Sequence, residues 1–227
     1  MSSTMSSPFP ADVAAPARLF EMRVYEARLG SGARLVGMFE QSFRPLYESV
    51  GVRIVASFND LDSPDRWVWF RAFPDAAARG AALTAFYAHP RWLELRRAAN
   101  ALIARSSDAR LLVPEAWHSL PLENGTLVEC ARIVGPSVHR YRSDVALAMS
   151  ENRGHGVETV GVLASCSARN TYPRQRLRQE PACVWLTRFG HPDEYARHVA
   201  ARSQSPAWRA IENGGVPLQR WRLAATR

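Results

Sequence analysis

The sequence contains no lysine. All 29 of its basic residues are arginine, and against 21 acidic residues they leave a net charge of +8. Without a lysine amino group the chain cannot form a Schiff base, which excludes pyridoxal phosphate and imine-type aldol chemistry. It also lacks the lysine of a phosphate-binding P-loop. Arginine binds carboxylates and phosphates through a planar fork, so the composition leaves an anionic small-molecule substrate open.

Cysteine and histidine are sparse, and neither forms a disulfide or metal-binding pattern. Cys130, Cys166 and Cys183 lie far apart and form no CxxC motif. This spacing predicts neither a disulfide framework nor a structural zinc site, and it favours the reducing cytoplasm. The histidines form no HExxH motif and no i, i+4 pair. We therefore expect no bound metal ion.

Long apolar runs are also absent. No run approaches the roughly 20 residues that span a bilayer, so we expect no membrane partner. An excess of arginine is typical of nucleic-acid-binding proteins, but here the arginines are scattered along predicted helices. No RRM, KH, zinc-finger or helix-turn-helix signature is present, so we expect no nucleic-acid partner.

The two halves of the chain carry the same order of local patterns. The strand-like run at 67–73 recurs at 183–189, and a turn with Pro and Asp follows each run. An alanine- and arginine-rich helical stretch comes next, with a Pro–x–Trp corner at 90–92 and again at 206–208. Such self-similarity predicts a repeat. The predicted organisation is a disordered lead-in over 1–17, a first unit over 18–118, a linker over 119–125 and a second unit over 126–227.

Each unit is predicted to run strand, helix, strand, strand, helix, strand. In the first unit the expected strands are 20–27, 52–58, 67–73 and 110–113, and the expected helices are 33–49 and 76–105. Gly51 ends the first helix, and Pro90 interrupts the second. Such a βαββαβ unit forms a ferredoxin-like antiparallel sheet with both helices on one face. The bare face needs an apolar partner, so we predict an α+β fold in which two tandem units pack their sheets into an α+β barrel.

Several of these patterns resemble the NIPSNAP family. They are the opening strand Phe20-Glu21-Met22-Arg23-Val24-Tyr25, the turn Gly30 to Gly32, the strand tryptophan Trp69 and the corner His89-Pro90-Arg91-Trp92. The resemblance covers nearly all of residues 18–118 and is weaker in the second half, where the opening strand lacks the aromatic residue. It implies membership of the dimeric α+β barrel class, which includes cofactor-free oxygenases, cyclases, isomerases, haem-binding enzymes and non-catalytic binders. It therefore implies fold more than function.

Polar and apolar residues alternate along the opening strand. Glu21, Arg23 and Tyr25 share one face, which we expect to point into the barrel interior, with the apolar residues toward the helices. Arg71 shares a face with Trp69 on the third strand and could join them. Buried polar groups need partners or a ligand, so this face is a candidate site. The alternative is an ion pair of Glu21 with Arg23 or Arg71 that only holds the strands together.

The second unit differs at matching positions. Thr187 stands where the first unit has Arg71, while Trp185 keeps the strand tryptophan. Cys130 could act as a nucleophile, but no motif places a histidine beside it, so a buried structural thiol is favoured. Arg132 shares a strand face with Cys130.

Two further features stand outside the strands. His118 follows the first unit, and we expect it to reach the mouth of the barrel. The loop at 169–178 is long and basic, whereas its counterpart at 59–65 is acidic. A long loop is often functional, so 169–178 could be a lid that brings arginines to an anionic substrate. A solvated loop is the favoured interpretation.

These patterns together predict a small-molecule enzyme of specialised metabolism that uses no flavin, haem, pyridoxal phosphate or zinc. Acid–base catalysis would carry out a cyclisation, isomerisation, lyase or oxygenase step. The candidate catalytic residues are Arg23, Tyr25, Glu21 and His118, and the candidate substrate-binding residues are Trp69, Arg71, Trp185 and Arg132. The alternative is a non-catalytic ligand-binding or assembly protein, because no complete catalytic motif is present. Haem binding through His118 ranks below both, and a homo-oligomer is left open.

Overall fold

The computed structural model describes residues 18–118, 122–154 and 157–226. The first half contains β1 (Leu19–Ala27), α1 (Gly32–Met38), the π-helical η1 (Phe39–Phe43), α2 (Arg44–Ser49), β2 (Arg53–Asp60), β3 (Arg66–Phe73), α3 (Ala76–Ala88), α4 (Pro90–Leu102) and β4 (Ile103–Trp117). The second half contains β5 (Leu127–Val134), the 3-10 helix η2 (Val138–Tyr141), α5 (Arg142–Gly154), β6 (Glu158–Ser165), β7 (Ala182–Phe189), α6 (Pro192–Arg202), α7 (Pro206–Asn213) and β8 (Leu218–Ala225). The predicted lead-in over 1–17 and residues 119–121 of the predicted linker lie outside the described residues.

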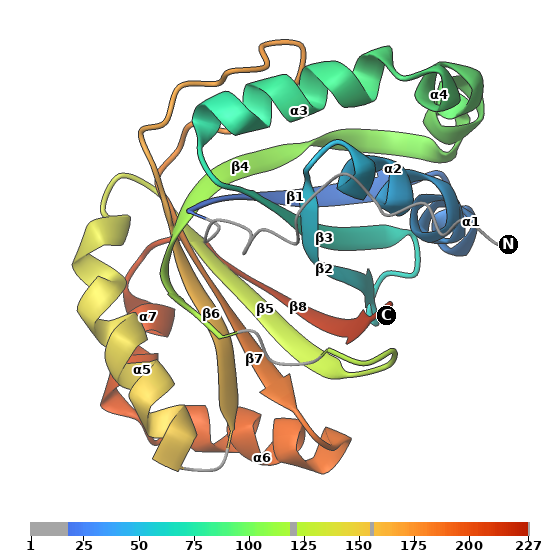
Figure 1. Ribbon diagram of the computed structural model, residues 1–227. Coiled ribbons are helices and arrows are strands. Elements are labelled where there is room, and N and C mark those ends of the chain that lie inside the picture. Colours follow the sequence, from blue (N-terminus) through green and yellow to red (C-terminus); the bar gives the residue numbers. More distant parts are fainter. Residues whose placement is uncertain (1–17, 119–121, 155–156, 227) are drawn as a thin grey trace, which may run out of the picture.

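The strands close into an antiparallel barrel in the order β1-β3-β2-β8-β5-β7-β6-β4. Pairing of β2 with β8 and of β4 with β6 joins the sheets of the two halves, so the edges of each sheet are hydrogen-bonded. Helices α1 to α4 cover the outside of the first half, and α5 to α7 cover the second (Figure 1). The predicted α+β barrel is therefore confirmed. Among the described residues, no helix has the length and apolar character needed to cross a membrane.

Two predicted helices differ from the observed ones. The second ends at Leu102, and β4 starts at Ile103, well before the predicted strand, because its backbone pairs with β1. That pairing is a tertiary contact that local composition does not reveal. The predicted break at the proline is present, since His89 is extended and its Nδ1 accepts a hydrogen bond from the Arg91 amide. The first predicted helix contains the π-helical segment η1.

The prediction for the two faces of β1 is wrong. Phe20, Met22 and Val24 point into the barrel, where they pack with apolar side chains from both halves. The alternate residues, Glu21 and Tyr25 among them, lie on the outer face beneath the helices. The strands close around a mainly apolar interior, so an unpaired polar group there would cost several kcal/mol. The outer face lies against helices that supply polar partners.

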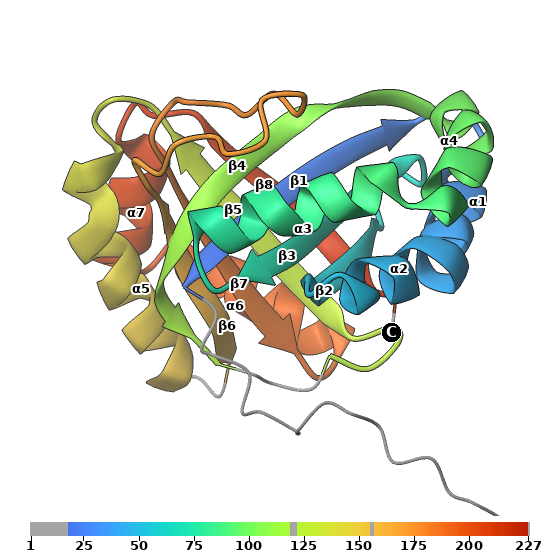
Figure 2. The ribbon, with the colours of Figure 1, turned by 45° about the horizontal axis from the view of Figure 1, so that its top comes forward.

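Between β6 and β7 the chain runs through residues 166–181 without a helix or strand, and we call this stretch the cover segment. It leaves the second half and crosses over α3 and β4 (Figures 1 and 2). Thr171 Oγ1 donates to the carbonyl of Ala76, and the Arg178 amide donates to the carbonyl of Ala109. The absence of a side chain at Gly80 allows the approach, since a Cβ there would lie 3.1 Å from Thr171. The cover segment thus packs on the first half.

Candidate functional site

One carboxylate and three guanidinium groups are buried together between the outer face of the first sheet and α3. Glu21 on β1 lies opposite Arg71 on β3 in the strand register. Glu21 Oε1 accepts hydrogen bonds from Arg71 Nη2 at 2.6 Å and from Arg23 Nη1 at 2.5 Å. Its Oε2 accepts from Arg79 Nε at 2.7 Å. Arg79 belongs to the first turn of α3, which Asp75 caps. Both predicted ion pairs of Glu21 are therefore present, and a third arginine joins them.

This cluster carries an excess of positive charge. Burial alone would raise the pKa of Glu21, but the charges of Arg71, Arg23 and Arg79 hold it well below its usual range. Burial would lower the pKa of Arg23, but Tyr25 and Glu21 raise it, so the guanidinium stays protonated. The carboxylate is thus ionised near neutral pH. Three cations around one anion leave two positive charges in excess, which is costly in a buried place unless an anion balances them.

A cavity of about 540 Å³ lies beside the cluster, bounded by the outer face of the sheet, the helices of the first half and the cover segment. The charged and amide side chains in its lining include Arg23, Arg96, Arg174, Gln175 and Arg176. Among the described residues that line it, none is a carboxylate, an imidazole or a thiol. Concave sites of this size with a few convergent polar groups are typical of small-molecule binding. The charges of its lining favour an anion.

Aromatic rings form a large part of the cavity wall. Trp67 and Trp69 stack on each other with ring centroids 5.1 Å apart and planes 8° apart. Tyr25 meets both rings edge-on, at 5.4 and 5.9 Å. On the helix side Tyr47 stacks on Phe86 at 3.8 Å. These flat apolar surfaces suit a planar ring system.

Gln175 of the cover segment lies at the boundary between the cavity and the charged cluster. Its Oε1 accepts hydrogen bonds from Arg71 Nη2 at 2.6 Å and from Arg23 Nη1 at 3.3 Å. Its Nε2 donates to the hydroxyl of Tyr87. Tyr172, also in the cover segment, stacks on Tyr87 with ring centroids 5.3 Å apart. The second half therefore completes a site that is built on the first.

The hydroxyls of the tyrosines and of Ser106 and Ser107 are the groups in the cavity lining that can both donate and accept a hydrogen bond. The Tyr25 hydroxyl accepts a hydrogen bond from Arg23 Nε at 3.0 Å. Burial raises the pKa of Tyr47 and of Tyr87, so both keep their protons near neutral pH. The arginines in turn supply fixed positive charge.

The structure brings five of the predicted site residues together. Arg23, Tyr25 and Trp69 line the cavity. Glu21 and Arg71 are fully buried and contact Arg23 and Gln175 respectively. The third-strand and first-strand residues therefore lie together, on the helix-facing side of the sheet.

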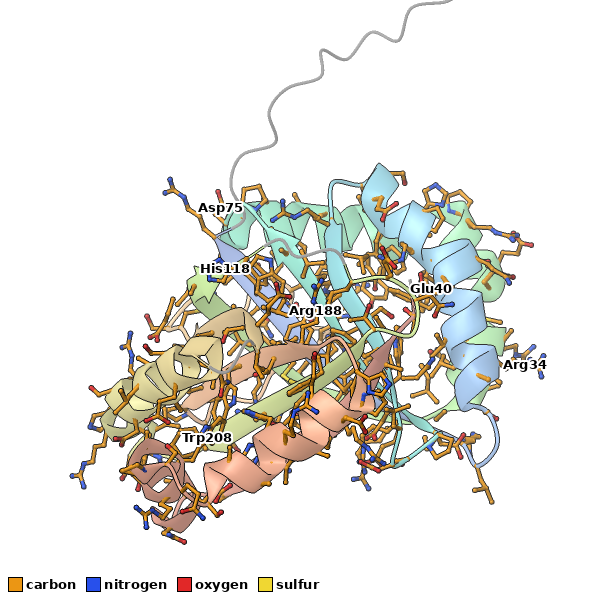
Figure 3. The ribbon with its side chains drawn as sticks, turned by 90° about the horizontal axis from the view of Figure 1, so that it is seen from below. Arg34, Glu40, Asp75, His118, Arg188 and Trp208 are labelled. Atoms are coloured by element: carbon orange, nitrogen blue, oxygen red, sulfur yellow. The ribbon has the colours of Figure 1, made fainter. Side chains whose placement is uncertain are left out.

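The other three predicted residues lie outside this cavity. His118 is exposed just beyond the end of β4 (Figure 3). Trp185 packs against Trp208, with ring centroids 6.1 Å apart, in the core of the second half. Arg132 makes a two-pronged ion pair with Asp108, at 3.0 and 2.8 Å. None of the three joins the arginine cluster.

Three residues of the site were not found by sequence reasoning: Arg79, Tyr87 and Gln175. Arg79 carried a usable signal, because it precedes Leu83 and Phe86 at helical spacing and so belongs to the buried face of α3. Gln175 carried none, since its contacts depend on where the cover segment lies. Tyr87 lines the cavity next to Phe86 and also contacts Trp92.

Among its described residues, the second half has no comparable cluster. Glu129 occupies the strand position that matches Glu21, but it stands opposite Thr187. A single arginine, Arg202 of α6, binds Glu129, so the pair is balanced in charge. Cys130 points into the barrel, and burial raises the pKa of its thiol. Within the described residues, no group of three or more His, Cys, Asp or Glu side chains is placed to hold a metal ion.

The NIPSNAP family model matches residues 20–119. The first half of the chain is a NIPSNAP domain. It contains β1, β3 and α3, and therefore Glu21 and its three arginines. The cover segment lies outside the matched residues, so the site of this NIPSNAP domain is completed by the other half. No curated protein matches the chain.

Solved structures are similar in fold to the NIPSNAP domain and the second half together. An anthrone oxidase-like protein has 12% sequence identity, covers 94% of this chain and 93% of its own, and gives a TM-score of 0.61. A candidate monooxygenase from Fusobacterium nucleatum has 9% identity, 93% coverage of both chains and a TM-score of 0.60. A candidate monooxygenase from Lactobacillus acidophilus NCFM has 11% identity, covers 93% and 95%, and gives a TM-score of 0.57. At these identities the likeness concerns the fold alone.

Proposed function

We propose that the protein is a small-molecule enzyme without an organic cofactor, whose cavity binds a planar aromatic anion. The observation that carries this proposal is the excess of positive charge at the cavity. Arg23, Arg71 and Arg79 surround a single carboxylate, Glu21, and stacked indoles form the adjoining wall. A bound anion would balance this charge, and its ring system would replace water against the aromatic wall.

The groups of the cavity support chemistry through an enolate or phenolate. Cyclisation, isomerisation, lyase and cofactor-free oxygenase steps share the loss of a C–H or O–H proton and a negative charge on oxygen. Arg23 would stabilise that oxygen electrostatically, and Tyr25, which contacts Arg23, is the candidate for proton transfer. Glu21 serves to hold the arginines, because its low pKa keeps it ionised.

An oxygenase step is one member of this set, and the names of the similar structures favour considering it. Dioxygen would be the oxidant. The substrate carbanion would reduce it to a hydroperoxide, and loss of one water would leave a ketone in place of the CH2 group. This balance requires only the substrate and dioxygen.

A non-catalytic binder is the second candidate. The observation that favours it is the lining of the cavity, which contains no carboxylate, imidazole or thiol among the described residues. Such a protein would bind the same anion without turning it over, so binding alone does not separate the two proposals.

The test uses two matched probes, 2-naphthoate and its neutral amide, 2-naphthamide. Calorimetric titration should show that 2-naphthoate binds at least about tenfold more tightly, since charge-assisted hydrogen bonds are roughly twice as strong as neutral ones. Equal affinity for both probes would contradict an anion site. Catalysis is tested by deuterium exchange at C1 of 2-tetralone in D2O, followed by NMR. Acceleration supports the enzyme, and binding of 2-naphthoate without acceleration supports the binder.

We also propose that residues 18–118 and 126–227 are tandem copies of one ferredoxin-like unit. The order strand, helix, strand, strand, helix, strand occurs in both halves, and the strand neighbours correspond. Superposition should bring Trp69 over Trp185, which occupy matching positions on β3 and β7. The free cysteines fit a reducing compartment such as the cytoplasm.

A further inference from the structure

The side chain of Gln175 occupies a position that is built for a negatively charged oxygen. Gln175 Oε1 lies between two guanidinium groups, 2.6 Å from Arg71 Nη2 and 3.3 Å from Arg23 Nη1. The same two nitrogens also donate to Glu21 Oε1, and guanidinium groups form their strongest hydrogen bonds with carboxylate oxygens. An amide oxygen carries no net charge. Gln175 therefore accepts both hydrogen bonds without neutralising the positive charge of the two guanidinium groups.

Arg71 has unused binding capacity behind this amide. Its side chain is fully buried, and its Nε and Nη1 have no hydrogen-bond partner among the described residues. Nη2 of Arg79 is also buried without a hydrogen-bond partner among the described residues. Arg23 and Gln175 line the cavity, whereas Arg71 is reached from the cavity past Gln175. Removal of the amide would therefore open Arg71 to a ligand in the cavity.

We propose that Arg23 and Arg71 form a carboxylate subsite that Gln175 fills in the free protein, and that a ligand carboxylate takes this position by displacing Gln175. This inference rests on the proposed function, since it assigns the anionic group of the ligand to one place in the cavity. The aromatic part of the ligand would then lie along Trp67 and Trp69, which adjoin Arg23 through Tyr25.

The cover segment is attached in a way that permits this displacement. On one side of Gln175, Thr171 holds the segment to α3 through the carbonyl of Ala76. On the other side, the amide of Arg178 holds it to β4 through the carbonyl of Ala109. The residues between these two anchors form no helix or strand, and Arg174 and Arg176 are exposed. The backbone of Gln175 is itself held, since its N–H donates to the Tyr172 carbonyl and its carbonyl accepts from Asn170 Nδ2. The displacement therefore requires only that the Gln175 side chain turn away while the segment stays attached. Because the segment belongs to the second half, that half controls access to the anion subsite of the first.

The displacement proposal is tested by substituting Gln175, the side chain that fills the subsite in the free protein. Gln175→Ala removes the competing oxygen and should bind 2-naphthoate about tenfold more tightly than the wild type, the factor expected for a hydrogen bond to a charged group. Gln175→Glu places a tethered carboxylate in the subsite and should bind 2-naphthoate at least about tenfold more weakly. The affinity for 2-naphthamide should change far less in both variants. Gln179→Ala, an exposed position in the same segment, is the matched control and should bind as the wild type does.

Two readouts separate failure of this inference from failure of the proposed function. If the wild type binds 2-naphthoate but neither Gln175 variant changes its affinity, the inference is overturned and the anion site stands. If neither the wild type nor Gln175→Ala binds 2-naphthoate, both are overturned. Should Gln175→Ala fail to fold, Gln175→Glu decides, because the inference also requires its melting temperature to exceed that of the wild type. A lower melting temperature together with unchanged 2-naphthoate affinity would count against the inference.

Discussion

Glu21 and Arg71 face each other across the β1–β3 ladder, and Arg71 Nη2 donates to Glu21 Oε1 over 2.6 Å. Neither side chain has exposed surface. With Arg23 and Arg79 on the same carboxylate, Glu21 is the counter-ion on which the site depends. The stability of this part of the protein is therefore tied to the ionisation of one residue.

Glu21→Gln should lower the free energy of unfolding by about 3–5 kcal/mol near neutral pH, because it leaves three buried guanidinium groups without their anion. The pKa of Glu21 in the folded protein is held below its ordinary value of 4.5. Its contribution to stability is thus fully present above that pH and is lost as the pH falls further. Urea unfolding of both proteins should show a difference that shrinks below pH 4.5. A difference that does not depend on pH would contradict this assignment.

Arg23→Met and Tyr25→Phe should separate binding from chemistry. Arg23→Met removes a guanidinium from the anion subsite and should weaken 2-naphthoate binding by at least about tenfold, or roughly 1.4 kcal/mol. Tyr25→Phe should bind the probe nearly as well but lose the acceleration of 2-tetralone exchange. Arg34→Met is the control, since Arg34 is exposed on α1 and points away from the molecule (Figure 3). Intact exchange in Tyr25→Phe would remove Tyr25 from the proposed mechanism.

Trp69 and Trp185 provide a matched pair for the cavity wall. Both are buried, both occupy the same position in their strands, and the indole Nε1 of each lacks a partner among the described residues. Replacing either by Phe should lower the free energy of unfolding by about 1–3 kcal/mol. Only Trp69→Phe should also change the affinity for 2-naphthoate, because only Trp69 lines the cavity. Equal effects on affinity would place the ligand elsewhere.

The three cysteines should differ sharply in reactivity. Cys130 and Cys183 are buried, and burial raises the pKa of both thiols, that of Cys183 to about 12. Cys166 lies at the start of the cover segment and is partly exposed. Native protein should therefore react with Ellman's reagent at Cys166 and, only after unfolding, at the other two. Rapid modification of Cys130 in the folded state would revive its role as a nucleophile.

Much of the architecture follows from local patterns in the sequence. Alternation along residues 20–27 and helical spacing along 33–49 predict a strand and a helix, and the recurrence of 67–73 at 183–189 predicts that this order is used again. The same alternation places Arg23 and Tyr25 on one strand face. These features depend on neighbours in the chain, so the sequence contains them without reference to the fold.

The tertiary structure decided which face of β1 points into the barrel and which face meets the helices. Both faces of this strand are buried, so alternation separates Phe20 from Glu21 but does not say which of them meets the helices. Closure of the barrel through β2–β8 and β4–β6 creates an interior that is mainly apolar around Phe20 and Met22, and that interior takes the apolar face. The partners of Glu21 were equally hidden, because Arg79 reaches it only through the packing of α3. The contact between Arg71 and Gln175 joins residues 104 positions apart. Such a contact arises from the path of the cover segment over the other half, which no local pattern encodes.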